Sequence, residues 1–344
     1  MSRWAVILAG GVGSRFWPLS TPERPKQLMP LAGNEPLLSD AVNRLAPLVP
    51  PERTLVLTNG SLANAIRELL PDLPAANVIA EPRARGTAPA LAWAASEIRS
   101  RSDATATMLS VHADWAVADA AAFRATLERA ADAAERHASL VTVGVVPTRP
   151  DPGFGYIQPG EPVDGARRVA RFVEKPDRTT AERMVSEGFL WNSGIFVWRV
   201  GDFLDEVRAR CPEVAPALAA ADRCDISAFF DSVTPISVDH GVLERSPHVL
   251  VLPGDFGWDD VGTWAALRRV RELDADGNAL SGSVHAVDST GNVVHTEGQT
   301  IVLYGVHDLV VVSRDGLTLV TTVERAADLK SLLAELPEQV RERP

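Results

Sequence analysis

The sequence predicts an α/β protein whose first domain has a mostly parallel sheet flanked by helices and whose second domain is small and rich in β-strands. Apolar runs of strand length alternate with segments of helical spacing over residues 1–273, which is typical of parallel sheets. The first run, 4–8, is almost entirely apolar, as expected for a strand covered on both faces. Short β-branched runs punctuated by glycines fill 277–344. We therefore expect one domain over 1–273 and a second over 277–344.

The expected elements follow one another in regular order. The strands of the first domain are expected at 4–8, 54–58, 77–80, 105–111, 140–146, 168–173, 189–198 and 249–252. Its helices are expected at 37–45, 61–70, 87–101, 123–137, 179–187, 201–221 and 263–273. The second domain should hold strands at 284–287, 292–295, 300–303, 309–312 and 317–321, and a final helix at 324–336.

The composition is that of an ordinary globular protein, with 46% hydrophobic and 23% charged residues. The formal net charge of −11 argues against a general nucleic-acid or anionic-membrane surface, because such a surface requires a basic face. Cys211 and Cys224 are too few for a disulfide framework, and no apolar stretch is long enough to span a bilayer. We therefore expect a cytoplasmic protein without nucleic-acid or membrane partners.

A glycine-rich turn follows the first strand and is a candidate phosphate-binding site. Glycines allow backbone N–H groups to approach a polyphosphate without interference from Cβ atoms. Arg15 and Lys26 add positive charge within reach of the same loop. The candidate nucleotide-binding residues at this turn are Leu8, Ala9, Gly10, Gly11, Gly13 and Ser14.

Three other interpretations of this turn compete with that one. A P-loop requires Gly-Lys-Ser/Thr at its end, where the chain has Gly13-Ser14-Arg15. A dinucleotide-binding turn requires a third glycine where Phe16 stands, and an acidic residue after the second strand, where the chain has Thr58-Asn59. A tight turn without a ligand would also explain the glycines taken alone.

Lysine is rare in this chain and falls at two suggestive places. Of the 34 basic residues only three are lysines, at positions 26, 175 and 330. An ammonium and a guanidinium are not interchangeable at a crowded phosphate, so lysine in Pro25-Lys26-Gln27 and Glu174-Lys175-Pro176 favours phosphate binding. Glu174 and Lys175 end a strand before a proline, where the chain turns and both side chains can enter one cleft. A surface ion pair is the alternative.

Further polar residues stand where ligands bind in such folds. Asp114 follows the strand 105–111, and the carboxyl ends of central parallel strands bind ligands, although a cap or loop carboxylate is the alternative. Asp259 and Asp260 lie among tryptophans and glycines, where paired carboxylates are costly without a cation or hydrogen bonds. Asn192 interrupts an aromatic strand and needs partners, which favours a sugar-hydroxyl contact over a structural turn.

Two residues have a sufficient local explanation. Thr87 can cap the helix 87–101, with Pro89 in its first turn, and Asp239 can cap a helix that starts near the cleft.

The full string Gly10-Gly11-x-Gly13-x-Arg15-x-Trp17-Pro18-Leu19-Ser20, followed by Pro25-Lys26-Gln27, resembles the signature of sugar-1-phosphate nucleotidyltransferases. Its Phe-Trp-Pro-Leu-Ser and Pro-Lys-Gln elements are similar to the mannose-1-phosphate guanylyltransferase (GDP-mannose pyrophosphorylase) branch in particular. The resemblance implies a Rossmann-like nucleotidyltransferase fold with a small C-terminal β-solenoid-like domain. It also implies nucleotidyl transfer from GTP to α-D-mannose 1-phosphate, giving GDP-mannose and pyrophosphate, with Mg²⁺ as cofactor.

The resemblance assigns roles to individual residues. It implies that Arg15, Lys26 and Lys175 are catalytic. It implies that Asp114 and Asp260 bind the metal, and Asp259 is expected to be a solvated neighbour. It implies that the sugar phosphate is bound by Gly155, Glu174, Lys175 and Asn192, although turn chemistry alone would explain Gly155.

On the nucleotide side the resemblance adds Glu81 and Thr87, with Glu81 expected to face the guanine edge. The chain departs from the family pattern at Gly86, where members usually have asparagine, and at His112 and Trp115, which flank Asp114. We expect His112 and Trp115 to be packing residues.

The implied reaction needs no general base, because a phosphate monoester with a second pKa near ~6 is already ionised at neutral pH. Catalysis then rests on positioning and on charge stabilisation. Two alternatives stay open: another sugar 1-phosphate or another nucleoside triphosphate as substrate, and a non-catalytic sensor of nucleotide sugars. The final helix is expected to pack on the chain or on a second subunit, which would make a homodimer.

Overall fold

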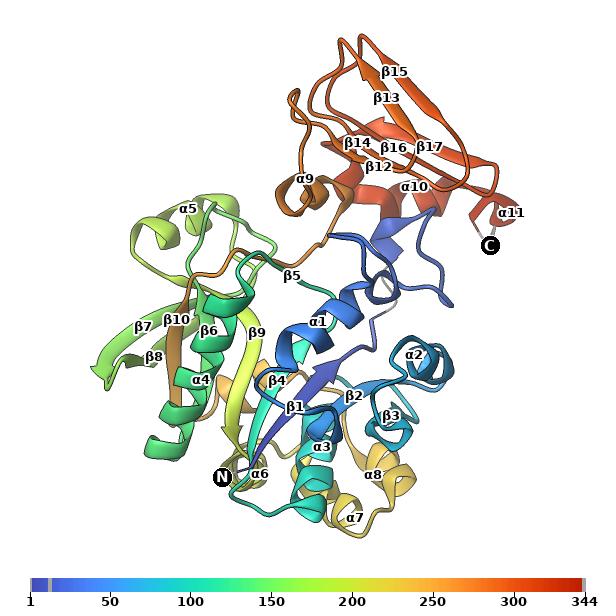
Figure 1. Cartoon of the computed structure of the whole chain (residues 1–344). Helices are drawn as coiled ribbons and strands as arrows, with labels where there is room; N and C mark the ends of the chain where they lie inside the picture. Colours follow the sequence, from blue (N-terminus) through green and yellow to red (C-terminus); the bar gives the residue numbers. More distant parts are fainter. Residues whose placement is uncertain (1, 12–13, 342–344) are drawn as a thin grey trace. The chain divides into compact units, whose positions relative to one another are not determined.

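The computed structural model describes residues 2–11 and 14–341, and the chain forms two compact units (Figure 1). The first unit comprises Met1–Gly10, Val42–His112 and Asp119–Phe256. The second comprises Gly11–Ala41, Ala113–Ala118 and Gly257–Pro344. Each unit is assembled from three separate segments of the chain. The predicted domain boundary between 273 and 277 is therefore not tested by this division and stays a prediction.

The first unit is built on a nine-stranded sheet with the order β3-β2-β1-β4-β9-β6-β10-β8-β7. The strands are β1 (Arg3–Leu8), β2 (Thr54–Asn59), β3 (Val78–Glu81), β4 (Thr107–His112), β6 (Leu140–Val145), β7 (Tyr156–Val163), β8 (Ala166–Val173), β9 (Leu190–Arg199) and β10 (Val249–Gly254). Strands β3, β2, β1 and β4 are parallel, and β6 and β10 form a second parallel pair. Strand β9 runs antiparallel between β4 and β6, and the hairpin of β7 and β8 adds antiparallel pairs. The predicted α/β class is confirmed, but the predicted mostly parallel, Rossmann-like sheet is corrected to a mixed one, because β9 and the β7–β8 hairpin pair in antiparallel fashion with their neighbours.

Helices cover this sheet and close its core. They are α1 (Leu37–Leu45, shared with the second unit), α2 (Ala63–Leu69), α3 (Thr87–Arg101), α4 (Ala120–His137), α5 (Arg178–Ser186), α6 (Val200–Arg210), α7 (Leu218–Asp222), α8 (Ile226–Ser232) and a π-helix, Asp239–Leu243. Helices α3 and α6 share a buried core with alternate residues of β1, Trp4, Val6 and Leu8. Helix α4 packs on β4, β9, β6 and β10.

The second unit contains the C-terminal β domain. The strands of the second unit are β5 (Ala116–Val117), β11 (Trp258–Asp259), β12 (Ala279–Ser281), β13 (Val284–Val287), β14 (Val293–Thr296), β15 (Ile301–Tyr304), β16 (Leu309–Arg314) and β17 (Leu317–Thr322). Its helices are α9 (Leu267–Val270), α10 (Leu329–Glu335) and α11 (Glu338–Arg341). Strands β12, β14 and β16 pair in parallel, β13 pairs with β15 in parallel, and β17 closes the first of these sheets in antiparallel fashion. The region after 277 is therefore rich in β-strands, as predicted.

Some predicted elements differ from the structure. The helix expected at 201–221 is interrupted after Arg210, before Pro212, and resumes as α7. The helix expected at 263–273 is a short 3₁₀ turn followed by α9. Within residues 2–11 and 14–341, no helix combines the length and the apolar character needed to cross a membrane.

Candidate active site

The glycine-rich turn begins where β1 leaves the sheet. Ala9 N donates to Leu57 O at 2.7 Å and Ala9 O accepts from Thr58 Oγ1 at 3.1 Å, so Ala9 is held by the sheet as it enters the turn. A Cβ added at Gly10 or Gly11 would meet no heavy atom within 4 Å. Packing therefore does not explain these two glycines, and their predicted contact with a nucleotide stays a prediction. Gly13 lies outside the described residues.

The turn continues into a 3₁₀ helix, Ser14–Phe16, in which Arg15 is exposed and Phe16 is buried. Gln27 Nε2 donates to Gly11 O at 2.8 Å and so ties the Pro-Lys-Gln segment to the glycine turn. The two parts of the sequence signature are thus joined by a direct hydrogen bond.

Lys26 is buried and joins three segments of the second unit. Its Nζ lies 2.9 Å from Asp114 Oδ2 and donates to Asp260 O at 3.1 Å and to Val261 O at 3.3 Å. The ammonium group therefore lies at both predicted metal-binding positions. The sequence predicts Lys26, Asp114 and Asp260 separately, and the structure brings them together.

A short antiparallel ribbon places the two predicted metal-binding residues near one of its ends. Strands β5 and β11 pair Ala116 with Asp259 and Val117 with Trp258. Asp114 precedes Ala116 and Asp260 follows Asp259, so both stand at the same end of the ribbon. Trp115 is buried with its ring edge-on to Trp258, at a centroid distance of 5.8 Å, which fits the packing role expected for it.

Asp259 corrects one expectation, because it is not a solvated neighbour. It is 5% exposed and receives Arg269 Nε at 2.6 Å and Nη2 at 3.1 Å. It also accepts from Val261 N at 2.9 Å. The charge of Asp259 is therefore compensated by Arg269. The neighbouring residue, Asp260, lies close to Gly262, with its Oδ2 2.5 Å from the position that a Cβ at Gly262 would take. A Cβ at position 262 would therefore displace the carboxylate of Asp260.

The donor set at this end of the ribbon fits a divalent cation. Among the described residues no group of three His, Cys, Asp or Glu side chains could hold a metal ion. Mg²⁺ is commonly bound by one or two carboxylates and completes its shell with water and substrate phosphates. Asp114 and Asp260 can supply such a pair, and Lys26 already neutralises part of the charge on Asp114.

The predicted sugar-binding residues lie in the first unit, around a β-bulge in β9. The register between β6 and β9 shifts so that Gly144 faces Asn192 while Val143 faces Ile195. Ser193 and Gly194 are the extra residues, and Ser193 Oγ donates to Val143 O at 2.6 Å. Bulges turn side chains away from the regular alternation and are common beside active sites. The bulge at Asn-Ser-Gly therefore changes the direction of the Asn192 side chain relative to that in a regular strand.

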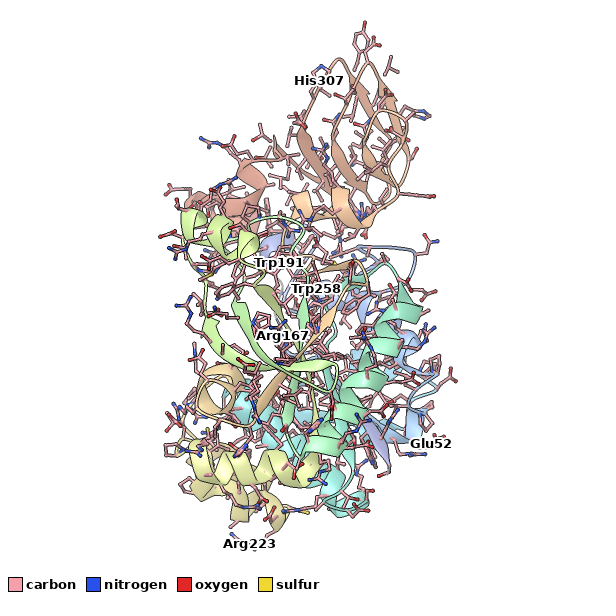
Figure 2. The ribbon with its side chains drawn as sticks, turned by 90° about the vertical axis from the view of Figure 1, so that its left-hand side faces the viewer. Glu52, Arg167, Trp191, Arg223, Trp258 and His307 are labelled. Carbon is pink, nitrogen blue, oxygen red and sulfur yellow. The ribbon has the colours of Figure 1, made fainter. Side chains whose placement is uncertain are left out.

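Gly155 lies against both Glu174 and Asn192 beside this bulge. Asn192 N donates to Gly155 O at 2.8 Å, and a Cβ at Gly155 would come within 2.7 Å of Glu174 Oε2. Lys175 has a φ of +42°, and its Nζ lies 3.0 Å from Glu174 Oε1 with a side chain that is 65% exposed. A positive φ at a non-glycine residue is strained, and such strain gathers at ligand sites. Trp191, which is labelled in Figure 2, precedes Asn192 and is buried. Its ring lies edge-on to that of Phe154, with 4.9 Å between the ring centroids.

Asp239 does not cap a helix, contrary to expectation. It lies inside the π-helix, and its Oδ1 accepts from Asn192 Nδ2 at 2.7 Å. Burial raises the pKa of Asp239, and the charge of Glu174 raises it further. Sequence reasoning missed this partner of Asn192 because 47 residues separate the two along the chain.

The predicted base-side residues also lie in the first unit. Glu81 ends β3, and burial raises the pKa of its carboxyl to about 7. Thr87 begins α3 but does not cap it, contrary to expectation: the cap position is Gly86, and Thr87 Oγ1 accepts from Val238 N at 2.9 Å. The departure at Gly86 has a steric reason, because a Cβ there would lie 2.4 Å from Ile236 O at a φ of +90°.

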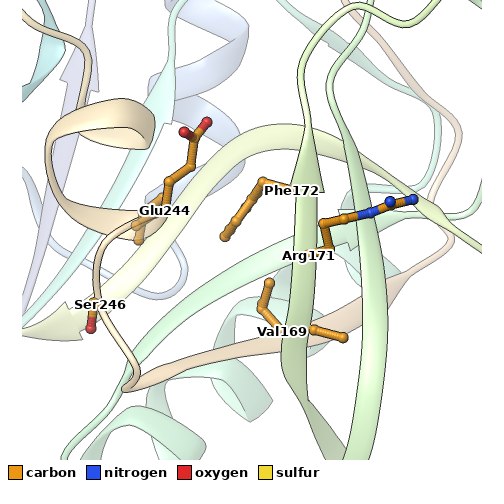
Figure 3. Close-up of a pocket in the computed structure, with 7 residues that line it drawn as sticks. Val169, Arg171, Phe172, Glu244 and Ser246 are labelled. Carbon is orange, nitrogen blue, oxygen red and sulfur yellow. The ribbon is translucent and has the colours of Figure 1, made fainter.

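A separate pocket of about 370 Å³ lies between β8 and the turn after the π-helix (Figure 3). Phe172 and Glu244 line it from opposite sides. None of the predicted site residues lines this pocket, so we do not assign the substrates to it.

Comparison with known proteins agrees with this arrangement. A family model described as nucleotidyl transferase matches residues 4–277, and one described as MannoseP isomerase/GMP-like beta-helix domain matches residues 282–336. The mannose-1-phosphate guanylyltransferase of Escherichia coli K12 is 36% identical over 352 residues, covering 97% of this chain and 73% of that protein. The xanthan biosynthesis protein XanB of Xanthomonas campestris pv. campestris is 37% identical over 345 residues, covering 96% of this chain and 72% of that protein.

A solved structure has the same fold over nearly the whole chain. The protein described as mannose-1-phosphate geranyltransferase from Thermus thermophilus superposes with a TM-score of 0.91 at 33% identity, covering 97% of this chain and 99% of that one. The family model over residues 4–277 and relatives that are 36–37% identical over nearly the whole chain show that the chain belongs to the nucleotidyl transferase family.

Proposed function

We propose that this chain is a mannose-1-phosphate guanylyltransferase, which transfers the guanylyl group of GTP to α-D-mannose 1-phosphate. The observation that carries the proposal is the 36% identity, over 97% of the chain, to a relative of that name. The joined glycine turn and Pro-Lys-Gln segment support it, because the same loop carries Arg15 and Lys26.

In the proposed reaction a phosphate oxygen of mannose 1-phosphate attacks the α-phosphorus of GTP. The bond from that phosphorus to the oxygen bridging it to the β-phosphorus breaks, and pyrophosphate leaves. No proton has to be removed from the nucleophile near neutral pH, because its second pKa is about 6. The protein must instead hold two polyanions together, so the residues that matter carry positive charge or backbone N–H groups.

The assigned roles follow from charge and location. Arg15, Lys26 and the loop backbone of Leu8, Ala9, Gly10, Gly11, Gly13 and Ser14 bind the triphosphate. Lys175 binds the sugar phosphate, and Gly155, Glu174 and Asn192 contact the sugar. Glu81 and Thr87 contact the nucleotide. Lys26 also forms an ion pair with Asp114, with 2.9 Å between Nζ and Oδ2.

We also propose Mg²⁺ as the divalent cation, held by Asp114 and Asp260. When bound it would reduce the charge repulsion between the phosphates. We further propose that the chain acts in the cytoplasm and forms a homodimer. We also propose that it consists of two functional domains, 1–273 and 277–344, and that the second of these is a short β-solenoid.

Pyrophosphate release tests the proposal. GTP, ATP, dTTP and UTP are each combined with mannose 1-phosphate, glucose 1-phosphate and galactose 1-phosphate in the presence of MgCl₂. We expect GTP with mannose 1-phosphate to give the highest kcat/KM. A higher value for another pair would change the specificity and keep the reaction. No release with any pair, combined with a rise in melting temperature on addition of GDP-mannose, would identify a non-catalytic sensor and contradict the proposal.

A further inference from the structure

Residues 236–239 connect the base-side and sugar-side groups of the first unit. At one end this segment is fastened to the start of α3. Ile236 N donates to Arg85 O at 3.0 Å, Ala88 N donates to Ile236 O at 3.2 Å, and Val238 N donates to Thr87 Oγ1 at 2.9 Å. The fit is close enough that only glycine is tolerated at position 86, opposite Ile236 O. The segment is therefore fixed relative to the proposed nucleotide-binding residue Thr87.

At its other end the same segment presents Asp239 to Asn192. Asn192 Nδ2 donates to Asp239 Oδ1 at 2.7 Å, and Asn192 Oδ1 accepts from Gly194 N at 3.3 Å. These two bonds settle which end of the amide is nitrogen and which is oxygen. An amide nitrogen has two N–H groups, and Asp239 takes one of them. The second is the donor that Asn192 can offer to a sugar hydroxyl.

Asp239 stands in a place that is costly for a carboxylate. It is partly buried beside Glu174, and a π-helix, which is rare and frequent at functional sites, places it there. If position 239 served packing alone, an uncharged side chain there would make the folded protein more stable. The contact with Asn192 gives the carboxylate a reason to be there.

We propose that Asp239 is a positioning residue for sugar recognition, which acts by locking the Asn192 amide with its second N–H directed to a sugar hydroxyl. The hydrogen bonds of the segment 236–239 fix the distance between Asp239 and the start of α3, where Thr87 is proposed to contact the nucleotide. The proposal rests on the proposed function, because it takes Asn192 as the sugar contact.

The test is a double-mutant cycle with Asp239→Ala, Asn192→Ala and the double variant, each measured for kcat, for KM of the sugar phosphate and for KM of GTP. We expect Asp239→Ala to raise the KM for mannose 1-phosphate about tenfold while kcat and the KM for GTP change less than about twofold. In the Asn192→Ala background the Asp239 substitution should have no further effect. Glu244→Gln, which changes an exposed carboxylate just after the same π-helix, is the matched control and should leave all three constants unchanged.

Asp239→Asn keeps the size of the side chain and replaces Asp239→Ala if that variant does not fold. Its amide can present either oxygen or N–H to Asn192, so the same KM should rise, by a smaller factor. An effect that adds to that of Asn192→Ala, or one that falls equally on both substrates, would overturn the proposal. If the wild type does not use GTP and mannose 1-phosphate, the proposed function has failed, and the cycle is read with the substrate pair the enzyme does use.

Discussion

Arg24 and Glu297 form a two-pronged ion pair, with Nη1 3.1 Å from Oε2 and Nη2 2.9 Å from Oε1. Arg24 lies two residues before Lys26, and Glu297 follows β14 of the C-terminal β domain. The loop and the β domain also share one apolar core, to which the loop contributes Phe16, Trp17 and Leu19. The β domain is therefore part of the support for the loop that carries Arg15 and Lys26.

Glu297→Gln tests this support. We expect kcat/KM to fall by between about tenfold and 10²-fold, because a displacement of about 1 Å of a positioning loop can cost that much. The melting temperature should fall by a few degrees. Asp308→Asn is the control, because Asp308 makes a comparable arginine pair with a side chain that is 71% exposed, and such pairs contribute little. Equal losses in both variants would show that Glu297 has no special role.

Asp259 and Asp260 are neighbours with opposite expected effects. Asp260→Asn should lower kcat by about 10² to 10³ without lowering the melting temperature, because it removes a proposed metal ligand. Asp259→Asn should lower the melting temperature instead, because it breaks the buried pair with Arg269. Measuring rate and melting temperature for both variants separates the roles. A thermally unstable Asp260→Asn with normal activity when folded would refute the metal assignment.

Much of the fold could be predicted from local pattern, and the failures have physical causes. Helix α3 has the predicted ends because its apolar spacing and first-turn proline are local signals. Strand β7 escapes prediction because Pro159 and Pro162 interrupt it, and proline is tolerated there only in an irregular, bulged pair. The helix expected at 201–221 is too long because Pro212 ends the first part.

The candidate site could be predicted in its residues but not in its contacts. Motifs point to Lys26 and Asp114 one by one, yet their ion pair joins positions far apart in sequence. Asp239 is expected to be a cap because a cap is the commonest reason for an aspartate before a helical segment. Only the three-dimensional structure shows that its partner is a side chain on β9.

Glu81 predicts a pH dependence of nucleotide binding. Burial raises the pKa of its carboxyl to about 7, so protonation as the pH falls below 7 removes an acceptor from the guanine edge. The KM for GTP should therefore rise as the pH is lowered from 8 to 6. The phosphates of GTP also titrate in this range, so Glu81→Gln is measured alongside. The ratio of the two KM values should change with pH, and a constant ratio would remove Glu81 from the base-binding site.

His295 predicts a loss of stability in acid. Burial, reinforced by the charge of Arg271, lowers the pKa of His295 to about 4, below its ordinary value of 6.5. Between these values the unfolded state binds the proton and the folded state does not, so stability falls as the pH drops through this window. The contribution between pH 7.5 and pH 5 is about 2 kcal/mol. Urea denaturation of wild type and His295→Gln at both pH values should show this difference, and parallel losses would contradict it.

The proposed binding of the sugar phosphate by Lys175 can be tested on the wild-type chain through the reactivity of its three lysines. Reductive methylation, followed by mass spectrometry of peptides, reports how accessible each ammonium group is. Lys175 is 65% exposed and should react quickly, whereas Lys26 is 9% exposed and bound to Asp114 and should react slowly. Mannose 1-phosphate should protect Lys175, because a bound phosphate covers the amine. Lys330, on the exposed part of α10, should react at the same rate with and without substrate. Equal rates at Lys175 with and without the sugar phosphate would show that this lysine does not bind it.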